Sequence, residues 1–185
     1  MKVALDACVL FPTVLREMLV GTAAAGGFAP VWSARILEEW ARATRRLPEG
    51  AEAIARREIA LLRTDWPAAE VAVEPDLVER LSLPDPDDRH VLAAAIAGGA
   101  AVLLTLNRTD FPTRTLARHG ILVRDPDGFL TELFHEGIPV PAVASAVQAR
   151  AEHASGRPQP LRPLLKRAGL PRLAKTLTAP LTIRR

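Results

Sequence analysis

Short apolar runs alternate with segments of helical periodicity along this 185-residue chain, and this alternation most constrains its fold. The runs predicted as strands are residues 2–5, 71–73, 101–105 and 121–123, with 28–32 as an extended link. Helices are predicted over residues 12–25, 34–45, 48–63, 76–81, 87–96, 113–119 and 127–135. The apolar side of the helix 48–63 is predicted to consist of Ile54, Ile59, Leu61 and Leu62. Strands that alternate with helices imply a parallel sheet covered on both faces. We therefore predict a three-layer α/β/α fold with a central parallel sheet of about four to five strands.

Composition narrows the class of protein and the kind of site. The length fits one domain with a small appendage. The longest stretch without Asp, Glu, Lys or Arg, residues 90–107, is broken by Gly98 and Gly99, and the first residues resemble a strand rather than a signal peptide, so a soluble, cytoplasmic protein without a membrane partner is expected. A single cysteine, Cys8, excludes an internal disulfide and a multi-cysteine metal site. Any metal must therefore be held mainly by oxygen.

The C-terminal segment differs from the rest in charge. Residues 136–185 hold nine basic and two acidic residues, a net charge of +7, which leaves −4 for residues 1–135 because the whole chain carries +3. We predict a main domain over 1–135 and a basic helical extension over 136–185, broken by Pro163, Pro171 and Pro180. Such an extension suits a polyanion, although a solvated tail has the same composition. Its candidate contacts with such a polyanion are Lys166, Arg167, Arg172 and Lys175.

Carboxylates follow two of the predicted strands. Asp6 comes directly after residues 2–5, and Asp110 lies in a turn shortly after 101–105. In parallel α/β sheets, ligands usually bind at the carboxyl ends of the strands. Asp6 taken alone fits a turn or capping residue equally well. Thr105 and Asn107 can stabilise the turn that holds Asp110 through side-chain hydrogen bonds.

The stretch LPDPDDRHVLAAAI, residues 83–96, contains three carboxylates within four positions. Its two prolines hold the chain extended, so Asp85 lies in a loop, while Asp87 and Asp88 open the next helix. Asp88 precedes two apolar residues by three and four positions and so lies on the core-facing stripe, whereas Asp87 is rotated away. A helix dipole favours any one such acid, but a cluster of three is tolerated best in open solvent or beside a cation. Asp88 is the predicted inward ligand, with Asp85 and Asp87 as helpers.

The predicted helix 34–45 offers a further carboxylate. Glu38 and Glu39 lie about 100° apart on it, so both are not expected to face one site. Glu39 lies near the apolar edge beside Trp40, whereas Glu38 can pair outward with Arg42. Glu39 is therefore the predicted site residue, although it can also reach Arg42 at i+3.

Asp6, Glu39, Asp88 and Asp110 together predict an acidic pocket with oxygen ligands only. Such ligands suit Mg²⁺ or Mn²⁺, and one or two such ions suit phosphate-ester hydrolysis. The histidines have no metal-ligand spacing and are expected at the surface; they are His90, His119, His135 and His153. The tryptophans Trp32, Trp40 and Trp66 are expected to pack rather than to stack on bases. A hydrolase that acts on nucleic acid is therefore predicted.

Four segments resemble, in order and spacing, those of the PIN-domain ribonucleases. They are VALDACVL, SARILEEW, DPDDRHVLAAAI and LLTLNRTDF, and the resemblance covers roughly residues 1–133. Many relatives carry a hydroxyl or amide residue after the first aspartate, whereas this chain has Ala7 and Cys8. The resemblance implies a PIN-like fold and a metal-dependent endoribonuclease directed at single-stranded RNA. It implies an acidic quartet of Asp6, Glu39, Asp88 and Asp110, supported by Thr105 and Asn107.

The resemblance also points to the VapC-like toxins of toxin–antitoxin pairs, in which an antitoxin protein blocks the site and represses transcription. Residues 136–185 resemble the helical extension of one larger subgroup, and their basic charge suits either contact with RNA or docking of the antitoxin. A homodimer is expected. An alternative is a PIN-like domain that binds RNA or a partner without cutting, although all four acids are retained. A haloacid-dehalogenase-type phosphatase is a second alternative, but it needs an aspartate where this chain has Cys8.

Overall fold

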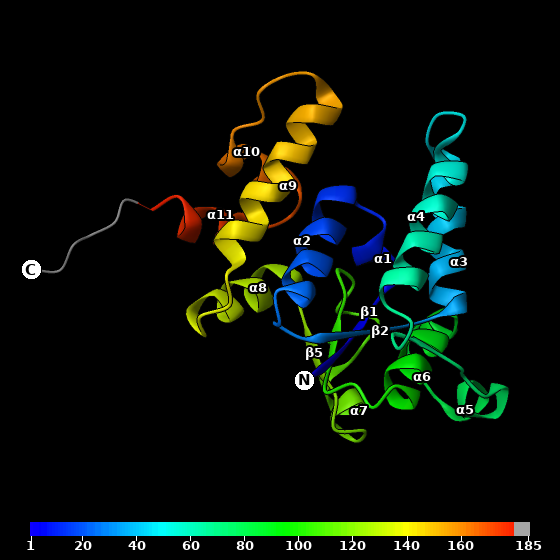
Figure 1. The fold of residues 1–185 in the computed structure, drawn as a ribbon. Helices are drawn as coiled ribbons and strands as arrows, with labels where there is room; N and C mark the ends of the chain where they lie inside the picture. Colours follow the sequence, from blue (N-terminus) through cyan, green and yellow to red (C-terminus); the bar gives the residue numbers. More distant parts are fainter. Residues whose placement is uncertain (180–185) are drawn as a thin grey trace, which may run out of the picture. The chain divides into compact units, whose positions relative to one another are not determined.

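A five-stranded parallel sheet forms the centre of the fold (Figure 1). The computed structural model of the chain describes residues 1–179, so Pro180, Arg184 and Arg185 of the predicted basic extension lie outside the described residues. The strands are β1 (Lys2–Leu5), β2 (Ala29–Ser33), β3 (Glu70–Val71), β4 (Val102–Leu104) and β5 (Leu122–Arg124). They are ordered β3-β2-β1-β4-β5, and every neighbouring pair is parallel. The predicted α/β class with a parallel sheet is confirmed.

Every helix predicted from the sequence is present, with its ends shifted by a few residues. The α-helices are α1 (Ala7–Leu10), α2 (Thr13–Ala24), α3 (Ala34–Ala43), α4 (Ala51–Asp65), α5 (Pro75–Arg80), α6 (Arg89–Ala97), α7 (Thr113–Ala117), α8 (Pro126–His135), α9 (Val140–Ser155), α10 (Leu161–Arg167) and α11 (Pro171–Leu177). A 3₁₀ turn, η1 (Thr44–Arg46), follows α3 directly, and a second one, η2 (Pro86–Asp88), directly precedes α6. Within residues 1–179, no helix is both long enough and apolar enough to cross a bilayer.

The prediction of an extended link over residues 28–32 was wrong, because β2 is a strand inside the sheet. Proline has no N–H to donate to a neighbouring strand, so it is disfavoured in the middle of a sheet. Pro30 pairs with Val3 of β1, whereas β3 pairs only with the end of β2, at Trp32 and Ser33. Pro30 therefore lies where β2 has a single paired edge, and this is where a sheet tolerates proline.

The chain divides into two compact units. The first comprises Met1–Phe11 and Phe28–Asp125 and contains the whole sheet. The second comprises Pro12–Gly27 and the chain from Pro126 onward, so α2 belongs with the C-terminal helices. The functional boundary predicted at residue 135 stays a prediction.

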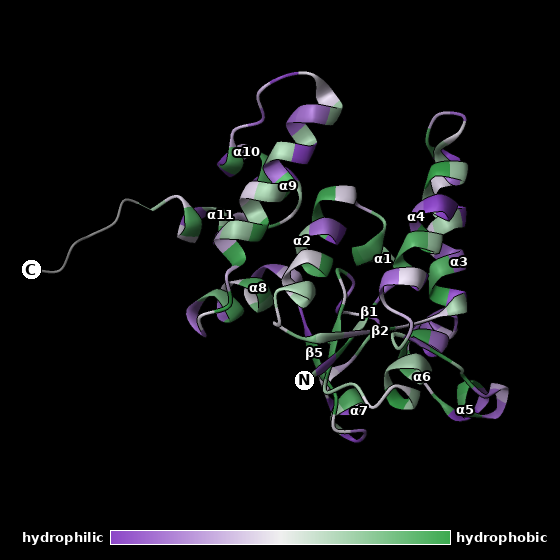
Figure 2. Ribbon diagram, in the orientation of Figure 1, coloured by the Kyte–Doolittle hydropathy of each residue, from purple (hydrophilic) through white to green (hydrophobic). Residues whose placement is uncertain are grey.

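Helix α6 supplies much of the core of the first unit. It packs against β1, β2 and β4, and His90 to Ala95 are all buried. Figure 2 shows α6 almost entirely in green, whereas α3 and α4 alternate green and purple. Trp32 and Trp40 are completely buried, which confirms the packing role predicted for them. The site residues next to α6 therefore rest on a rigid part of the fold.

Helix α4 buries a narrower face than the sequence predicted. Ile54 and Leu61 were assigned to its apolar side, but they are 62% and 55% exposed. Ala55, Ile59 and Leu62 are buried instead, at the i, i+4, i+7 spacing of one helical stripe. Because α4 packs against α3 on one side only, residues about 100° from that stripe face solvent.

The second unit is built on the packing of α2 against α9. Gly21 allows the close approach, since a β-carbon there would lie 2.6 Å from Cγ1 of Val143. Glu17 of α2 accepts a hydrogen bond of 2.8 Å from Arg150 of α9. The buried carboxylate of Asp127, in the first turn of α8, accepts hydrogen bonds from the backbone N–H groups of Arg172 and Leu173 at 2.8 and 2.9 Å. Asp127 therefore caps the start of α11.

Candidate functional site

Asp6 and Thr105 follow the carboxyl ends of β1 and β4, which are adjacent parallel strands. This register brings the two side chains together although they are 99 residues apart in sequence. Oγ1 of Thr105 donates a hydrogen bond of 2.7 Å to Oδ2 of Asp6. Both residues are buried, and Asp6 is only 5% exposed. The sheet edge predicted to carry the site therefore holds a fixed carboxylate.

The thiol of Cys8 is the second donor to Asp6, at 3.0 Å from the same Oδ2. The backbone N–H of Leu106 in turn donates to Sγ of Cys8 at 3.2 Å. Burial, and then the charge of Asp6, raise the pKa of the Cys8 thiol to about 12, so it stays protonated and able to donate. From sequence, Cys8 is recognised only as a difference from PIN-domain relatives, many of which carry a hydroxyl or amide residue after the first aspartate. The structure shows that a thiol supplies a hydrogen bond to the carboxylate from this position.

The buried thiol is expected to react slowly with iodoacetamide, because only the thiolate is nucleophilic. With a pKa of about 12, almost no thiolate is present near neutral pH. Unfolding in urea returns the thiol pKa to its ordinary range. We expect alkylation of the folded protein to be at least about tenfold slower than that of the unfolded chain, as followed by mass spectrometry. Equal rates would contradict a buried, hydrogen-bonded thiol.

Asp85, Asp88 and Asp110 form the tightest group of carboxylates among residues 1–179. One oxygen from each lies within 4.8 Å of the others. Asp85 is exposed, whereas Asp88 and Asp110 are half-buried. Oδ1 of Asp85 also accepts a hydrogen bond of 2.9 Å from the backbone N–H of Asp87, which holds the η2 turn in place. The structure thus places an oxygen of Asp85 within 4.8 Å of both Asp88 and Asp110, although the sequence predicted Asp85 only as a helper.

The environment of Asp88 links this group to the other predicted acids. Burial raises the pKa of Asp88 from 3.8 to about 6, and the negative charges of neighbouring carboxylates add to the effect. Those neighbours, in decreasing order of effect, are Asp6, Asp85, Asp110 and Glu39. Asp6, Glu39 and Asp110 therefore lie near enough to Asp88 to affect it electrostatically, although they come from the chain after β1, from α3 and from the loop after β4.

Asn107 connects the loop after β4 to Asp110. Its Nδ2 donates to Oδ2 of Asp110, and its Oδ1 accepts a hydrogen bond of 2.9 Å from Thr109. The backbone N–H of Asn107 donates to Oγ1 of Thr105 at 3.0 Å. A continuous chain of hydrogen bonds therefore runs from Asp6 through Thr105 and Asn107 to Asp110.

Glu39 reaches the site from α3, and its side chain is 51% exposed. Its Oε2 lies 3.1 Å from Nε2 of His90. Glu38 forms ion pairs with two arginines instead. Its carboxylate oxygens lie 2.8 Å from Arg42 and 2.9 Å from Arg56. These two arginines lower the pKa of Glu38 to about 2. The outward pairing predicted for Glu38 is present.

The prediction that His90 is a surface residue was wrong, because it is only 5% exposed. It lies in the first turn of α6, where both the sheet and α3 pack against the helix. The buried arc of α6 is therefore wider than the apolar stripe in its sequence. The contact between His90 and Glu39 joins residues 51 positions apart, so helical periodicity alone could not identify it.

An open cavity of about 370 Å³ lies between α3 and the start of α6. It is lined by Arg35, Glu38, Glu39, Arg42, Asp87, Asp88 and His90. Carboxylate oxygens are the ligands that Mg²⁺ and Mn²⁺ prefer, and clustered acids that repel each other are stabilised by a divalent cation. The donor set and the raised pKa of Asp88 therefore fit a divalent metal site.

The predicted RNA contacts lie in the second unit. Lys166 and Arg167 belong to α10, Arg172 and Lys175 belong to α11, and all four are exposed. Arg167 donates a hydrogen bond of 2.7 Å to Gln159. Their contact with RNA stays a prediction.

Comparison with known families gives one result. The family model described as "PIN domain" matches residues 2–109, which is more than half of the chain and includes Asp6, Glu39 and Asp88. A search of curated proteins found no match, and a search of solved structures found none either.

Proposed function

This chain belongs to the PIN-domain family, and we propose that it is a metal-dependent endoribonuclease that hydrolyses phosphodiester bonds in single-stranded RNA. PIN domains are generally metal-dependent nucleases, and the acidic cluster of this chain fits a metal site. The observation that carries the proposal is the surroundings of Asp88. Burial raises its pKa to about 6, and the negative charges of four neighbouring carboxylates add to this effect, as expected where a cation belongs.

In this proposal Asp6 and Asp88 are the principal metal ligands, and Glu39 and Asp110 complete the set. The cation, Mg²⁺ or Mn²⁺, would supply positive charge that polarises the phosphate and lowers the pKa of a water molecule. Thr105 and Cys8 hold the Asp6 carboxylate in one orientation, since both donate to its Oδ2. Supporting roles are proposed for Thr105, Asn107, Asp85 and Asp87.

The reaction is hydrolysis by in-line attack of water on phosphorus. The new bond joins the water oxygen to phosphorus, and the bond from phosphorus to the 3′ oxygen breaks. The leaving 3′ oxygen takes up a proton, so the products carry a 5′-phosphate and a 3′-hydroxyl. A carboxylate-rich site that orients water and phosphate without covalent attack suits this outcome.

We further propose that the protein is the toxin of a toxin–antitoxin pair, that it acts in the cytoplasm as a homodimer, and that its partner is an antitoxin protein. The support is the family and the VapC-like order of the four sequence segments. The neighbouring reading frame tests this role. Expression of this chain alone should arrest growth, and co-expression of a small adjacent gene should restore it.

The nuclease proposal is tested with the purified full chain and single-stranded RNA. We expect cleavage with Mg²⁺ or Mn²⁺, loss of cleavage with a chelator, and 5′-phosphate ends on the products. Asp6→Asn should lower the rate at least about 100-fold, because it removes a charge that a divalent cation needs. Asp65→Asn, at an exposed acid at the end of α4, is the matched control and should leave the rate unchanged. The proposal fails if wild-type protein cuts no RNA, or if Asp6→Asn cuts as fast as wild type.

A further inference from the structure

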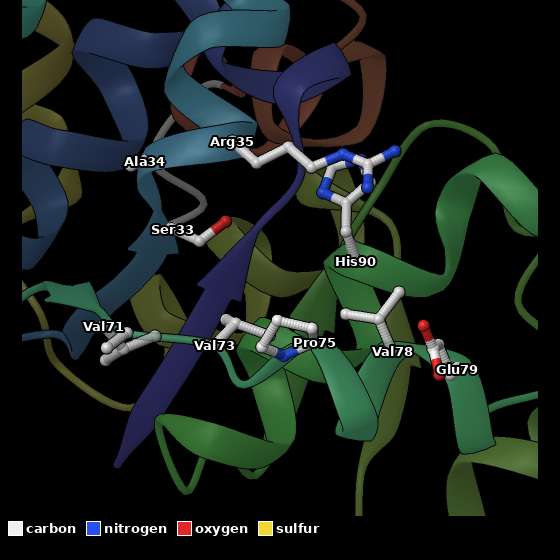
Figure 3. Close-up of a pocket in the computed structure, with 10 residues that line it drawn as sticks. Ser33, Ala34, Arg35, Val71, Val73, Pro75, Val78, Glu79 and His90 are labelled. Carbon is white, nitrogen blue, oxygen red and sulfur yellow. The ribbon is translucent and has the colours of Figure 1, made fainter.

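A second cavity of about 460 Å³ lies beside the acidic one, in the same unit of the protein (Figure 3). Its walls come from the start of α3, from β3 and the chain that follows it, and from α5 and α6. Val71, Val73 and Val78 give these walls an apolar character, and Ser33 lies at one edge. The volume lies within the range of about 300–1,000 Å³ that small-molecule pockets occupy.

The two cavities share Arg35 and His90, which line both of them. In Figure 3 the side chains of these two residues extend toward each other at one end of the apolar pocket. Arg35 is exposed, and its guanidinium forms no ion pair with any residue in the described part of the chain. An unpaired cation therefore stands where the apolar pocket meets the carboxylates.

His90 adds a second, independent sign of a ligand. Its Nε2 faces Glu39, but its Nδ1 is buried and has no hydrogen-bond partner among residues 1–179. Buried polar atoms in native proteins are almost always paired, so an unpaired one in a residue that lines two cavities indicates a missing partner. A histidine ring nitrogen can take part in a hydrogen bond, so a polar group of a ligand can supply the partner that Nδ1 lacks.

We propose that this apolar pocket binds one nucleobase of the RNA strand, next to the phosphodiester that the carboxylates receive. This inference rests on the proposed nuclease function. A nucleobase is flat and largely apolar on its faces, and its edge carries hydrogen-bonding groups that can pair with Nδ1 of His90. Arg35 can stack its planar guanidinium on the base or contact the adjoining phosphate. A pocket of this kind selects substrates that present an unstacked base, which single strands do and duplexes do not.

The occupant is a nucleobase rather than a lipid or a peptide because of what adjoins the pocket. The shared residues Arg35 and His90 make the apolar space continuous with an acidic cavity. A ligand that spans both must present an apolar planar group, a hydrogen-bonding group and an anionic group to Arg35. A nucleotide within a strand has all three, and its phosphate can meet the carboxylates only together with a cation.

Calorimetric titration of the full chain in Mg²⁺ buffer tests the pocket without any cleavage step. The ligands are the four nucleoside 5′-monophosphates and, as the matched ligand without a base, ribose 5-phosphate. At least one nucleotide should bind at least about tenfold more tightly than ribose 5-phosphate, as base burial in a pocket predicts. Val78→Trp, which fills the pocket from α5, should reduce that nucleotide's affinity to the level of ribose 5-phosphate. Ile54→Trp, at an exposed position on α4, should leave it unchanged.

Because no bond is broken in this titration, its result is separate from that of the RNA cleavage assay. Equal affinities of all four nucleotides and ribose 5-phosphate would overturn the base pocket and leave the nuclease proposal intact. Unchanged nucleotide affinity in a folded Val78→Trp protein would also overturn it. His90→Phe gives a second check, since loss of Nδ1 should weaken nucleotide binding more than ribose 5-phosphate binding.

Discussion

Asp88→Asn is expected to stabilise the metal-free protein while it lowers RNA cleavage at least about 100-fold. The pKa of Asp88 in the folded state is about 6, above its ordinary 3.8, so the folded state binds the proton more tightly than the unfolded chain does. Stability is therefore highest below about pH 4 for this group, and it falls as the pH rises through about 6. At neutral pH the ionised carboxylate destabilises the fold.

The neutral amide of Asn removes both the cost of burying a charge at position 88 and the repulsion from the neighbouring carboxylates, at all pH values. Because Asp88 is only half-buried, solvent screening reduces the gain to about 1 kcal/mol, a rise in melting temperature of roughly 2–4 °C. Added Mg²⁺ should raise the melting temperature of the wild type but not of the variant, since only the wild type keeps the full set of ligands. Calorimetry in chelator and in Mg²⁺ measures both effects. A variant that is less stable than wild type without metal would contradict the repulsion among these acids.

The alternation of apolar runs and helical periods was enough to predict the fold class, because strand and helix periods differ and are local properties. The prediction of a link over residues 28–32 was wrong, because the sequence does not reveal that this segment pairs with β1 and that β3 covers only its end. The assignment of Ile54 and Leu61 was wrong as well, because the face of a helix that is buried depends on its neighbours. Local patterns thus predicted the elements, and tertiary packing decided which of their faces are covered.

The candidate site divides in the same way. Asp6 and Asp110 could be proposed as site residues because the ends of strands can be predicted from sequence. Asp88 could be proposed because helical periodicity shows which face of a helix a residue lies on. The contacts of Cys8 with Asp6 and of His90 with Glu39 depend on how separate segments meet. A thiol and an imidazole in apolar surroundings carry no periodic signal. The apolar pocket could not be predicted from sequence either, since its walls come from separate segments that only the fold brings together.

Asp127→Ala is expected to cost about 3 kcal/mol of unfolding free energy, because a buried carboxylate that accepts two backbone N–H groups makes charge-assisted hydrogen bonds. The N–H groups belong to Arg172 and Leu173 in the first turn of α11, and Leu173 is completely buried. Without the cap, these donors remain unsatisfied, and the first turn of α11 is destabilised. Urea unfolding followed by circular dichroism gives the free energy.

A local readout separates the cap from a general loss of packing. In Asp127→Ala the amides of Arg172 and Leu173 should exchange with solvent faster, relative to global unfolding, than amides in the middle of α9. Asp127→Asn keeps one acceptor oxygen and should lose about half as much free energy. Glu136→Ala, at an exposed acid beyond the end of α8, should change stability by no more than about 0.5 kcal/mol. If Asp127→Ala unfolds at the same urea concentration as Glu136→Ala, Asp127 does not hold α11 in place.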